Sequence, residues 1–242
     1  MTIPLSELRS ELDTKGFAHI KLFTPEELTT IRGYIQNIIE KGTGLNIENL
    51  GSYHSHVTED QHRVMSTKVN RILSPDQSDN VIQFKSIQNI FRLLPQHIPM
   101  PVTYGWSGKE DRPEVYFRLV RPGKSTDVGS MHKDLWFHEL YNADFDKVSY
   151  KLWIAVEVSP SQNGLYIYPE SRQMDLNYLA VETPDGPRPV PDFPPSVAGT
   201  ELLVPTASGD AIVFQDTLLH RGAVNVADTT RISVEITLSP AA

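Results

Sequence analysis

Apolar side chains recur at helical spacing near the start of the chain. Thr24, Pro25 and Glu27 form the sequence pattern of a capping box with proline in the first helical position. The pattern therefore predicts a helix that begins at Pro25, and Gly42 predicts its end. One face of this helix is expected to pack on the core through apolar residues three or four positions apart: Leu28, Ile31, Ile35, Ile38 and Ile39.

The first helix is followed by a polar segment and then by a second segment with helical spacing. Residues 43–77 are polar without a sustained period, which favours a long loop or lid. A second helix is predicted between Asp79 and Leu94, and Pro95 would end it. Its apolar face would comprise Val81, Phe84, Ile87 and Phe91.

From Pro113 the spacing changes to short alternating or fully apolar runs punctuated by turn-forming residues, as in an antiparallel sandwich or jelly roll. The proline-rich residues 181–200 are typical of a surface insertion between strands. We expect one domain over residues 1–242, with a helical part at 1–112 and a β core at 113–242. The predicted strands are Val115–Val120, Tyr150–Val158, Leu165–Tyr168, Leu202–Val204, Ala211–Phe214 and Arg231–Leu238.

Composition narrows the chemistry. The chain has 242 residues, 39% hydrophobic and 21% charged, as in globular proteins. It contains no cysteine, so a metal would be held by His, Asp or Glu. A net charge of -8 disfavours nucleic acid and anionic membranes as partners, although a local pocket for an anion remains possible. Without a signal peptide or an apolar run long enough to span a bilayer, a cytoplasmic location is expected.

His132 and Asp134 are the sharpest candidates for metal ligands. Residues two apart on an extended strand point to the same side, so this pair can converge on one ion. An H-x-D triplet alone is common and is more often solvated polar surface. His220 follows an apolar run that ends at Leu219 and would complete the two-histidine, one-carboxylate set of non-haem iron oxygenases, which leaves positions open.

Arg231 begins the last predicted strand, and alternation places Ser233 on the same face. For an isolated strand such a polar face would usually be solvated. Beside a metal site, a planar guanidinium with a neighbouring hydroxyl is suited to binding a carboxylate.

In combination these residues resemble the phytanoyl-CoA dioxygenase-like family of Fe(II)/2-oxoglutarate oxygenases. The resemblance covers most of the chain. Its motifs run in order from Lys15-Gly16-Phe17-Ala18-His19-Ile20 through His132-x-Asp134, Lys151-Leu152-Trp153-Ile154-Ala155, Asn163-Gly164-Leu165 and Pro169-Glu170-Ser171-Arg172 to Gly209-Asp210-Ala211-Ile212-Val213-Phe214, His220 and Arg231-x-Ser233.

The resemblance implies a mainly β fold with N-terminal helices, a double-stranded β-helix of the jelly-roll, cupin-like type. It implies Fe(II) held by His132, Asp134 and His220, with 2-oxoglutarate and O₂ as cosubstrates. Arg231 and Ser233 would hold the distal end of 2-oxoglutarate, and no catalytic residue beyond the metal ligands is required. The cosubstrate pocket would also include Trp153, although a buried strand tryptophan is as often simply core.

The resemblance is incomplete at two positions. Arg172 and Arg221 replace residues common among relatives, and both flank the site, where they would reshape access for substrate. Asp134 is retained, which favours hydroxylation over halogenation, because related halogenases lack this carboxylate. Further candidates for the barrel mouth are Tyr116, Arg118 and Lys151, with surface placement at least as plausible.

Two other functions remain open: a metal-dependent cupin-like enzyme that uses no 2-oxoglutarate, and a non-catalytic jelly-roll binding module. We expect a small-molecule substrate, a small polar metabolite or natural-product intermediate, whose identity and oxidised position the sequence leaves undetermined, as it does the oligomeric state. A local anion patch is nevertheless conceivable from Arg112, Arg118, Arg121, Lys124 and Arg172. A second metal site at His54-Ser55-His56 or His138-Glu139 is disfavoured, because exposed histidines rarely bind metal.

Overall fold

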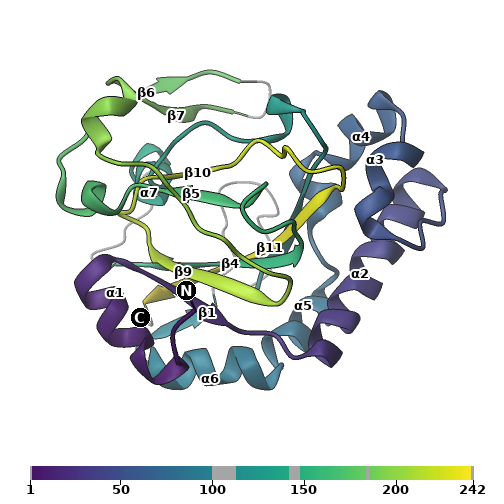
Figure 1. Cartoon of the computed structure of the whole chain (residues 1–242), viewed down its shortest axis with the longest axis horizontal. Helices are drawn as coiled ribbons and strands as arrows, with labels where there is room; N and C mark the ends of the chain where they lie inside the picture. Colours follow the sequence, from purple (N-terminus) through teal and green to yellow (C-terminus); the bar gives the residue numbers. More distant parts are fainter. Residues whose placement is uncertain (1, 100–112, 142–147, 184–185, 241–242) are drawn as a thin grey trace.

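A computed structural model describes residues 2–99, 113–141, 148–183 and 186–240 (Figure 1). Its α-helices are α1 (Leu8–Lys15), α2 (Pro25–Thr43), α3 (Tyr53–His56), α4 (Glu59–Met65), α5 (Pro75–Ile82), α6 (Lys85–Leu93) and α7 (Asp134–Leu140). Its strands are β1 (Phe17–Lys21), β2 (His97–Pro99), β3 (Val115–Val120), β4 (Tyr150–Glu157), β5 (Leu165–Ile167), β6 (Tyr178–Val181), β7 (Arg188–Pro191), β8 (Leu202–Leu203), β9 (Asp210–Gln215), β10 (His220–Gly222) and β11 (Arg231–Pro240).

Two antiparallel sheets form the body of the protein. The larger has the order β1-β9-β4-β11-β2, with β3 also paired to β11, and the smaller has the order β10-β5-β8. Figure 1 shows the smaller sheet above the larger one, with α2, α5 and α6 along the outside of the larger sheet. This arrangement confirms the predicted mainly β, double-stranded β-helix fold.

Strand β4 shows how the alternation of side chains divides the core. Leu152, Ile154 and Val156 belong to a cluster with the buried faces of α2 and α6, whereas Trp153 and Ala155 pack with residues of β5 and β9 between the sheets. Both faces of β4 are therefore buried, as expected of a strand covered by helices on one side and by a sheet on the other. The inner face is the one that reaches the candidate site.

The first predicted helix is confirmed, except for its end. Thr24 and Glu27 form both hydrogen bonds of the capping box before Pro25. The helix continues through Gly42 and ends where Gly44 adopts a left-handed conformation with φ 74°. Gly42 serves packing instead: a Cβ there would lie 2.5 Å from the sulfur of Met65.

The loop predicted at residues 43–77 is wrong, because this segment holds α3, α4 and the start of α5. Two further capping boxes, at Thr58 with Gln61 and at Ser74 with Gln77, begin α4 and α5. These helices are short, so the apolar period used for the prediction has too few turns to be visible. The single helix expected at 79–94 is also wrong: α5 ends at Ile82 and α6 begins at Lys85, after an extended residue.

The division at residue 112 does not separate helices from strands. Strand β1 pairs with β9 in the larger sheet, with Phe17 opposite Phe214, and β2 pairs with β11. The one-domain organisation over 1–242 stays a prediction. Among the described residues, no helix has both the length and the apolar character needed to cross a membrane.

Residues 181–200 are more than a surface insertion. Together with residues 178–180 they form the β6–β7 hairpin, in which Leu179 lies opposite Val190, and a 3₁₀ turn follows. The hairpin contacts α7, where the rings of Trp136 and Tyr178 are 5.3 Å apart. It therefore covers the helix that carries Asp134.

Candidate metal centre and cosubstrate pocket

The side chains of the three predicted metal ligands converge, but His132 and Asp134 do not lie on one strand as expected. His132 and His220 form an isolated antiparallel bridge, each backbone N–H donating to the other's carbonyl at 3.0 and 2.9 Å. Asp134 is the first residue of α7, so the expected strand geometry for the pair is wrong. The chain turns from the bridge into the helix, and this turn directs the carboxylate back toward both imidazoles.

Both imidazoles are oriented by backbone carbonyls. The Nδ1 atom of His132 lies 2.7 Å from the Ser130 carbonyl, and that of His220 lies 3.0 Å from the Leu218 carbonyl. A carbonyl only accepts hydrogen bonds, so each Nδ1 carries the proton and each Nε2 keeps its lone pair. This is the arrangement of histidines that ligate metals.

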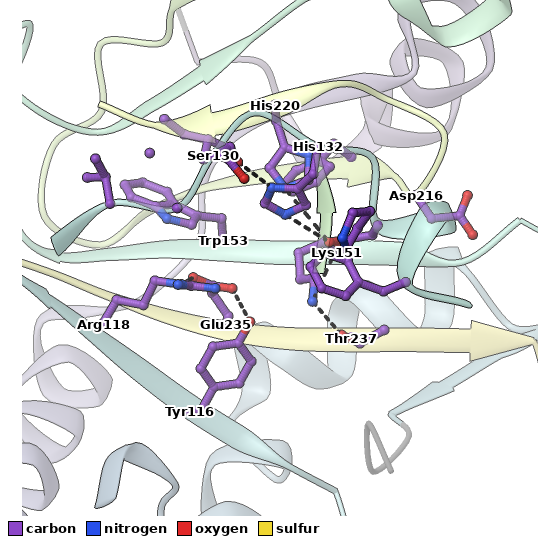
Figure 2. Close-up of a pocket in the computed structure, with 18 of the residues that line it drawn as sticks. Tyr116, Arg118, Ser130, His132, Lys151, Trp153, Asp216, His220, Glu235 and Thr237 are labelled. Carbon is purple, nitrogen blue, oxygen red and sulfur yellow. Dashed lines mark hydrogen bonds and ion pairs between the residues drawn. The ribbon is translucent and has the colours of Figure 1, made fainter. Parts of the chain in front are cut away.

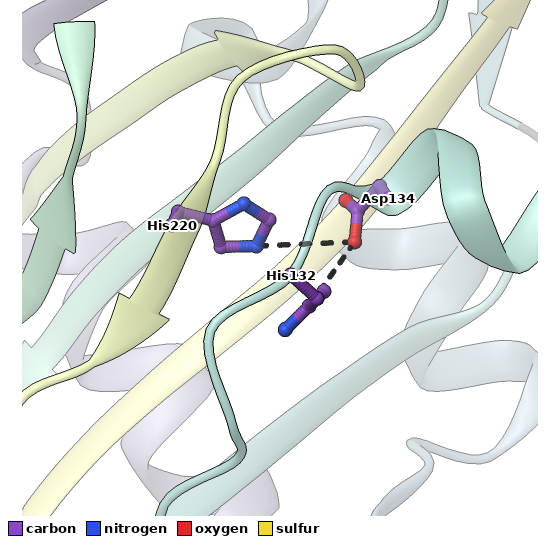
Figure 3. A group of neighbouring side chains, drawn as sticks. All are labelled: His132, Asp134 and His220. Atoms are coloured by element: carbon purple, nitrogen blue, oxygen red, sulfur yellow. Dashed lines mark ion pairs between the residues drawn. The ribbon is translucent and has the colours of Figure 1, made fainter. Parts of the chain in front are cut away.

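The candidate ligand atoms face a common point (Figure 3). Oδ1 of Asp134 is 3.6 Å from Nε2 of His132 and 3.8 Å from Nε2 of His220. One ligand atom from each residue lies within 4.8 Å of the other two. Two imidazoles and one carboxylate at this spacing fit a single divalent ion, with the remaining positions open toward the cavity.

Electrostatics favour the protonation state that a metal requires. Burial lowers the pKa of His220 to about 4, with a further contribution from His132, so this imidazole is neutral at pH 7. Burial alone would raise the pKa of Asp134, but Lys151 and the two histidines hold it well below its usual range. A neutral His220 imidazole and an ionised Asp134 carboxylate can bind a metal without first losing protons.

A cavity of about 230 Å³ adjoins this group and lies between the two sheets. Tyr116, Arg118, Lys151 and Trp153, all predicted from the sequence, line it. In Figure 2, Lys151 lies between His132 and Thr237, while Tyr116, Arg118 and Glu235 group together on one side. Surface placement of the three barrel-mouth candidates is thus wrong.

Lys151 links the metal group to β11. Its Nζ donates to Oγ1 of Thr237 at 2.8 Å and lies 3.5 Å from Oδ2 of Asp134. Glu235, which we did not predict, accepts from Nε of Arg118 at 2.6 Å and from the Tyr116 hydroxyl. The alternation that singled out Arg231 and Ser233 extends to Glu235 and Thr237, so the same signal would have found both.

Arg231 lines this cavity, and both Arg231 and Ser233, two residues apart on β11, are buried, with exposures of 1% and 0%. Arg231 donates from Nη1 to the Gly164 carbonyl at 2.8 Å and lies over the Trp153 ring at 5.6 Å. Its Nε and the Ser233 Oγ have no hydrogen-bond partner in the described part of the chain. Burial, together with the charge of Arg118, lowers the pKa of Arg231 to about 10.

Within the described residues, no carboxylate forms an ion pair with Arg231. A buried cation without a counterion is costly, and so is a buried hydroxyl without a partner. The pair therefore fits an anionic ligand with two acceptor oxygens, such as the distal carboxylate of 2-oxoglutarate.

The two departures from the family pattern do not reach the cavity. Arg172 donates to the carbonyls of Leu12 and Asp13 at the end of α1. Arg221 points to the other side of β10, where it pairs with Glu201 at 2.6 Å. Neither residue lines the cavity, and the expectation that they reshape access for substrate stays a prediction.

Among the described residues, the other histidines form no second metal group. His132, Asp134 and His220 are the single group with metal-ligand spacing in the described part of the chain. His54 bonds to the Thr230 hydroxyl at 3.0 Å, and His138 is buried in the cavity wall. His138 was thus wrongly placed in a polar surface segment.

The fold and this site define a class: a jelly-roll protein in which a histidine-aspartate-histidine group that could hold a metal and a buried arginine line one cavity. The chain matches the family model described as "Phytanoyl-CoA dioxygenase (PhyH)" over residues 12–233. It therefore belongs to the phytanoyl-CoA dioxygenase family of Fe(II)/2-oxoglutarate-dependent oxygenases, which confirms the resemblance.

Similar proteins agree with this family. The chain is 30% identical over 120 residues to phytanoyl-CoA dioxygenase domain-containing protein 1 of Danio rerio; the match covers 46% of this chain and 38% of that protein. AviO1 from Streptomyces viridochromogenes Tue57 is 15% identical with a TM-score of 0.62, over 100% of this chain and 97% of AviO1. EvdO2 from Micromonospora carbonacea var. aurantiaca, solved with 2-oxoglutarate, is 12% identical with a TM-score of 0.63, over 100% of this chain and 92% of EvdO2. At these identities the two structures establish the fold alone.

Proposed function

We propose that the protein is a 2-oxoglutarate-dependent hydroxylase in which His132, Asp134 and His220 bind Fe(II). Arg231 and Ser233 bind the distal carboxylate of 2-oxoglutarate. The observation that carries this proposal is the buried Arg231 guanidinium, whose Nε has no partner among the described residues and which lines the same cavity as the histidine-aspartate-histidine group. The buried hydroxyl of Ser233, also without a described partner, lies two residues further along β11. Family membership favours it over a cupin-like enzyme that uses no 2-oxoglutarate and over a silent binding module.

When bound, iron and 2-oxoglutarate supply the oxidising chemistry: 2-oxoglutarate, O₂ and a substrate C–H group give succinate, CO₂ and the hydroxylated product. The protein supplies orientation. The Ser130 and Leu218 carbonyls fix the two imidazoles, and Lys151 holds the free oxygen of the Asp134 carboxylate. The Lys151 contact keeps the negative charge compensated without occupying Oδ1.

Aromatic side chains pack against the two imidazoles of the metal group. Phe214 and His220 have ring centroids 4.5 Å apart, and Phe137 packs edge-on against His132 at 5.3 Å. Trp153 covers Arg231 from the β4 side. The burial of Arg231 strengthens its proposed pairing with a carboxylate, because charges attract more strongly in a low-dielectric site.

We further propose a small polar metabolite or natural-product intermediate as substrate. A cavity of about 230 Å³ must accept 2-oxoglutarate together with the substrate atoms nearest the metal, which favours a small molecule. The test is a screen of candidate compounds for stimulated release of succinate by the Fe(II) protein. Mass spectrometry under ¹⁸O₂ should then show one labelled oxygen in the organic product; desaturation or cyclisation without oxygen incorporation would contradict the hydroxylase assignment.

A further inference from the structure

A second arginine whose buried Nε has no described hydrogen-bond partner lines the cavity. Arg71 ends the 3₁₀ turn Lys68–Arg71, whereas Arg118 lies on β3 and Arg188 on the β6–β7 hairpin. All three line the cavity that holds the metal group. Three segments far apart in the sequence therefore bring guanidinium groups to one cavity, in a protein whose net charge is -8.

Each of the four carboxylates that line this cavity has a hydrogen-bond or ion-pair partner other than Arg71. Glu235 is bonded to Arg118 and Tyr116. Asp127 accepts from Arg121 at 2.9 Å and lies 3.2 Å from Nε2 of His62. Asp134 belongs to the metal group and contacts Lys151. The fourth, Asp216, accepts the Ser149 N–H at 2.9 Å.

Arg71 has no such partner. Its Nε is buried without a hydrogen bond, and within the described residues its guanidinium forms no ion pair. Burial, followed by the charge of Arg118, lowers its pKa to about 10, and Arg188 acts in the same direction. An arginine that simply extended into solvent would keep its Nε hydrated. Burying a hydrogen-bond donor without an acceptor costs free energy, unless a bound ligand accepts its hydrogen bond.

The backbone holds Arg71 in place. Ile72 forms a β-bridge with Tyr116, and the Leu73 N–H donates to the Val115 carbonyl at 2.9 Å. The residues directly after Arg71 are thus fastened to the edge of β3, beside Arg118. The backbone that carries Arg71 is therefore positioned before a ligand arrives, which lowers the entropic cost of binding.

Arg71 and Arg231 differ in ways that separate their roles. Arg231 is fully buried beside Ser233, whereas Arg71 is partly exposed. Resting on the proposed function, which gives Arg231 to 2-oxoglutarate, we propose that Arg71 binds an oxyanion carried by the substrate, with Arg188 adding positive potential. The substrate class is then a small organic acid or an acidic ester: a carboxylate, sulfate or phosphate monoester shares the paired oxygens that a guanidinium recognises.

The test compares charged and neutral probes on protein loaded with Mn(II) and 2-oxoglutarate, in a buffer without phosphate, sulfate or sulfonate. Isothermal titration uses hexanoate, hexyl sulfate and hexyl phosphate, with hexanamide and hexanol as neutral counterparts. At least one anion is expected to bind tenfold or more tightly than the neutral compounds. The comparison among the three anions identifies the headgroup.

Variants at Arg71 decide whether this residue is responsible. Arg71→Gln should weaken binding of the preferred anion at least tenfold, and Arg71→Lys should recover part of the loss. Affinity for Mn(II) and 2-oxoglutarate should change less than twofold in both variants. The control is Arg63→Gln in the neighbouring helix α4, where the side chain is 79% exposed and pairs only with exposed Asp60; it should leave anion binding unchanged.

Three results would overturn the inference: no preference for any anion over its neutral counterparts, equal anion binding in wild type and Arg71→Gln, or displacement of 2-oxoglutarate by the anion. Failure of wild type to bind 2-oxoglutarate instead contradicts the proposed function. The Arg71 comparison is then repeated with Mn(II) alone, where it still decides whether Arg71 binds an anion.

Discussion

Replacing Arg231 with alanine should weaken 2-oxoglutarate binding and leave metal binding intact. The guanidinium is 1% exposed and has an unpartnered Nε, so the carboxylate it would bind is shielded from water. Loss of one partner from a buried, hydrogen-bonded charge pair costs roughly 2–5 kcal/mol. Since about 1.4 kcal/mol is a factor of ten, the dissociation constant for 2-oxoglutarate should rise at least about thirtyfold.

Further variants separate the contributions of Arg231 and Ser233 to 2-oxoglutarate affinity. Arg231→Lys should recover only part of the affinity, because an ammonium group cannot reproduce the planar fork. Ser233→Ala removes one hydrogen bond to a charged group and should cost roughly 1.5–3 kcal/mol. The matched control is Arg221→Gln, whose side chain points away from the cavity toward Glu201, and its 2-oxoglutarate affinity should be that of wild type.

Isothermal titration of 2-oxoglutarate into the anaerobic Mn(II) protein measures these effects directly. Mn(II) affinity is measured separately on each variant. Unchanged 2-oxoglutarate affinity in Arg231→Ala would refute the assignment of the cosubstrate site. Loss of Mn(II) affinity in the same variant would show that Arg231 supports the structure of the metal group instead.

The remaining predictions concern the three proposed metal ligands, the buried carboxyl of Asp216 and the stability effect of Arg231. Substitution of His132, Asp134 or His220 by alanine should abolish succinate formation while far-UV circular dichroism stays that of wild type; near-normal turnover in any variant with iron bound would remove that residue from the ligand set. Burial raises the pKa of Asp216 to about 7, so the native protein binds a proton there more tightly than the unfolded chain, and the resulting stability is lost as pH rises through about 7. In metal-free protein, the unfolding free energy of wild type should therefore fall by about 3 kcal/mol relative to that of Asp216→Asn as the pH rises from 5 to 8, at 1.36 kcal/mol per pKa unit. Urea unfolding measures this difference, and a difference that does not change with pH contradicts the prediction. Arg231→Met removes a buried charge that has no ion-pair partner among the described residues. Thermal unfolding of the metal-free variant should therefore occur at or above the wild-type temperature. An unfolding temperature many degrees lower would show that this charge does not destabilise the ligand-free protein.

The sequence predicted the β core and the candidate site better than the N-terminal helices. Strands such as β3 and β11 have both a strict alternation and flanking turns, so their bounds were found to within two residues. Helices α4 and α5 are two turns long, and their apolar faces are too short for a period to appear. Their capping boxes carried the available signal.

The residues of the candidate site also fall into those that the strand pattern predicts and those that it does not. Arg231, Ser233 and Trp153 could be found because each occupies a defined place in a strand whose inner face was predictable. Arg71 could not, because it reaches the cavity only through the tertiary bridge between Ile72 and Tyr116. The turn that brings Asp134 back to His132 depends on a helix beginning at Asp134, which two-residue spacing on a strand does not predict.

The central claim is that one cavity holds a metal bound by His132, Asp134 and His220 beside 2-oxoglutarate bound by Arg231. The most direct measurement is an anaerobic titration of the Fe(II) protein with 2-oxoglutarate, followed by visible absorption. The account predicts a weak metal-to-ligand charge-transfer band that saturates at one equivalent in wild type and shifts to higher 2-oxoglutarate concentration in Arg231→Ala. Absence of the band in iron-loaded wild type, with 2-oxoglutarate present in excess, would contradict it.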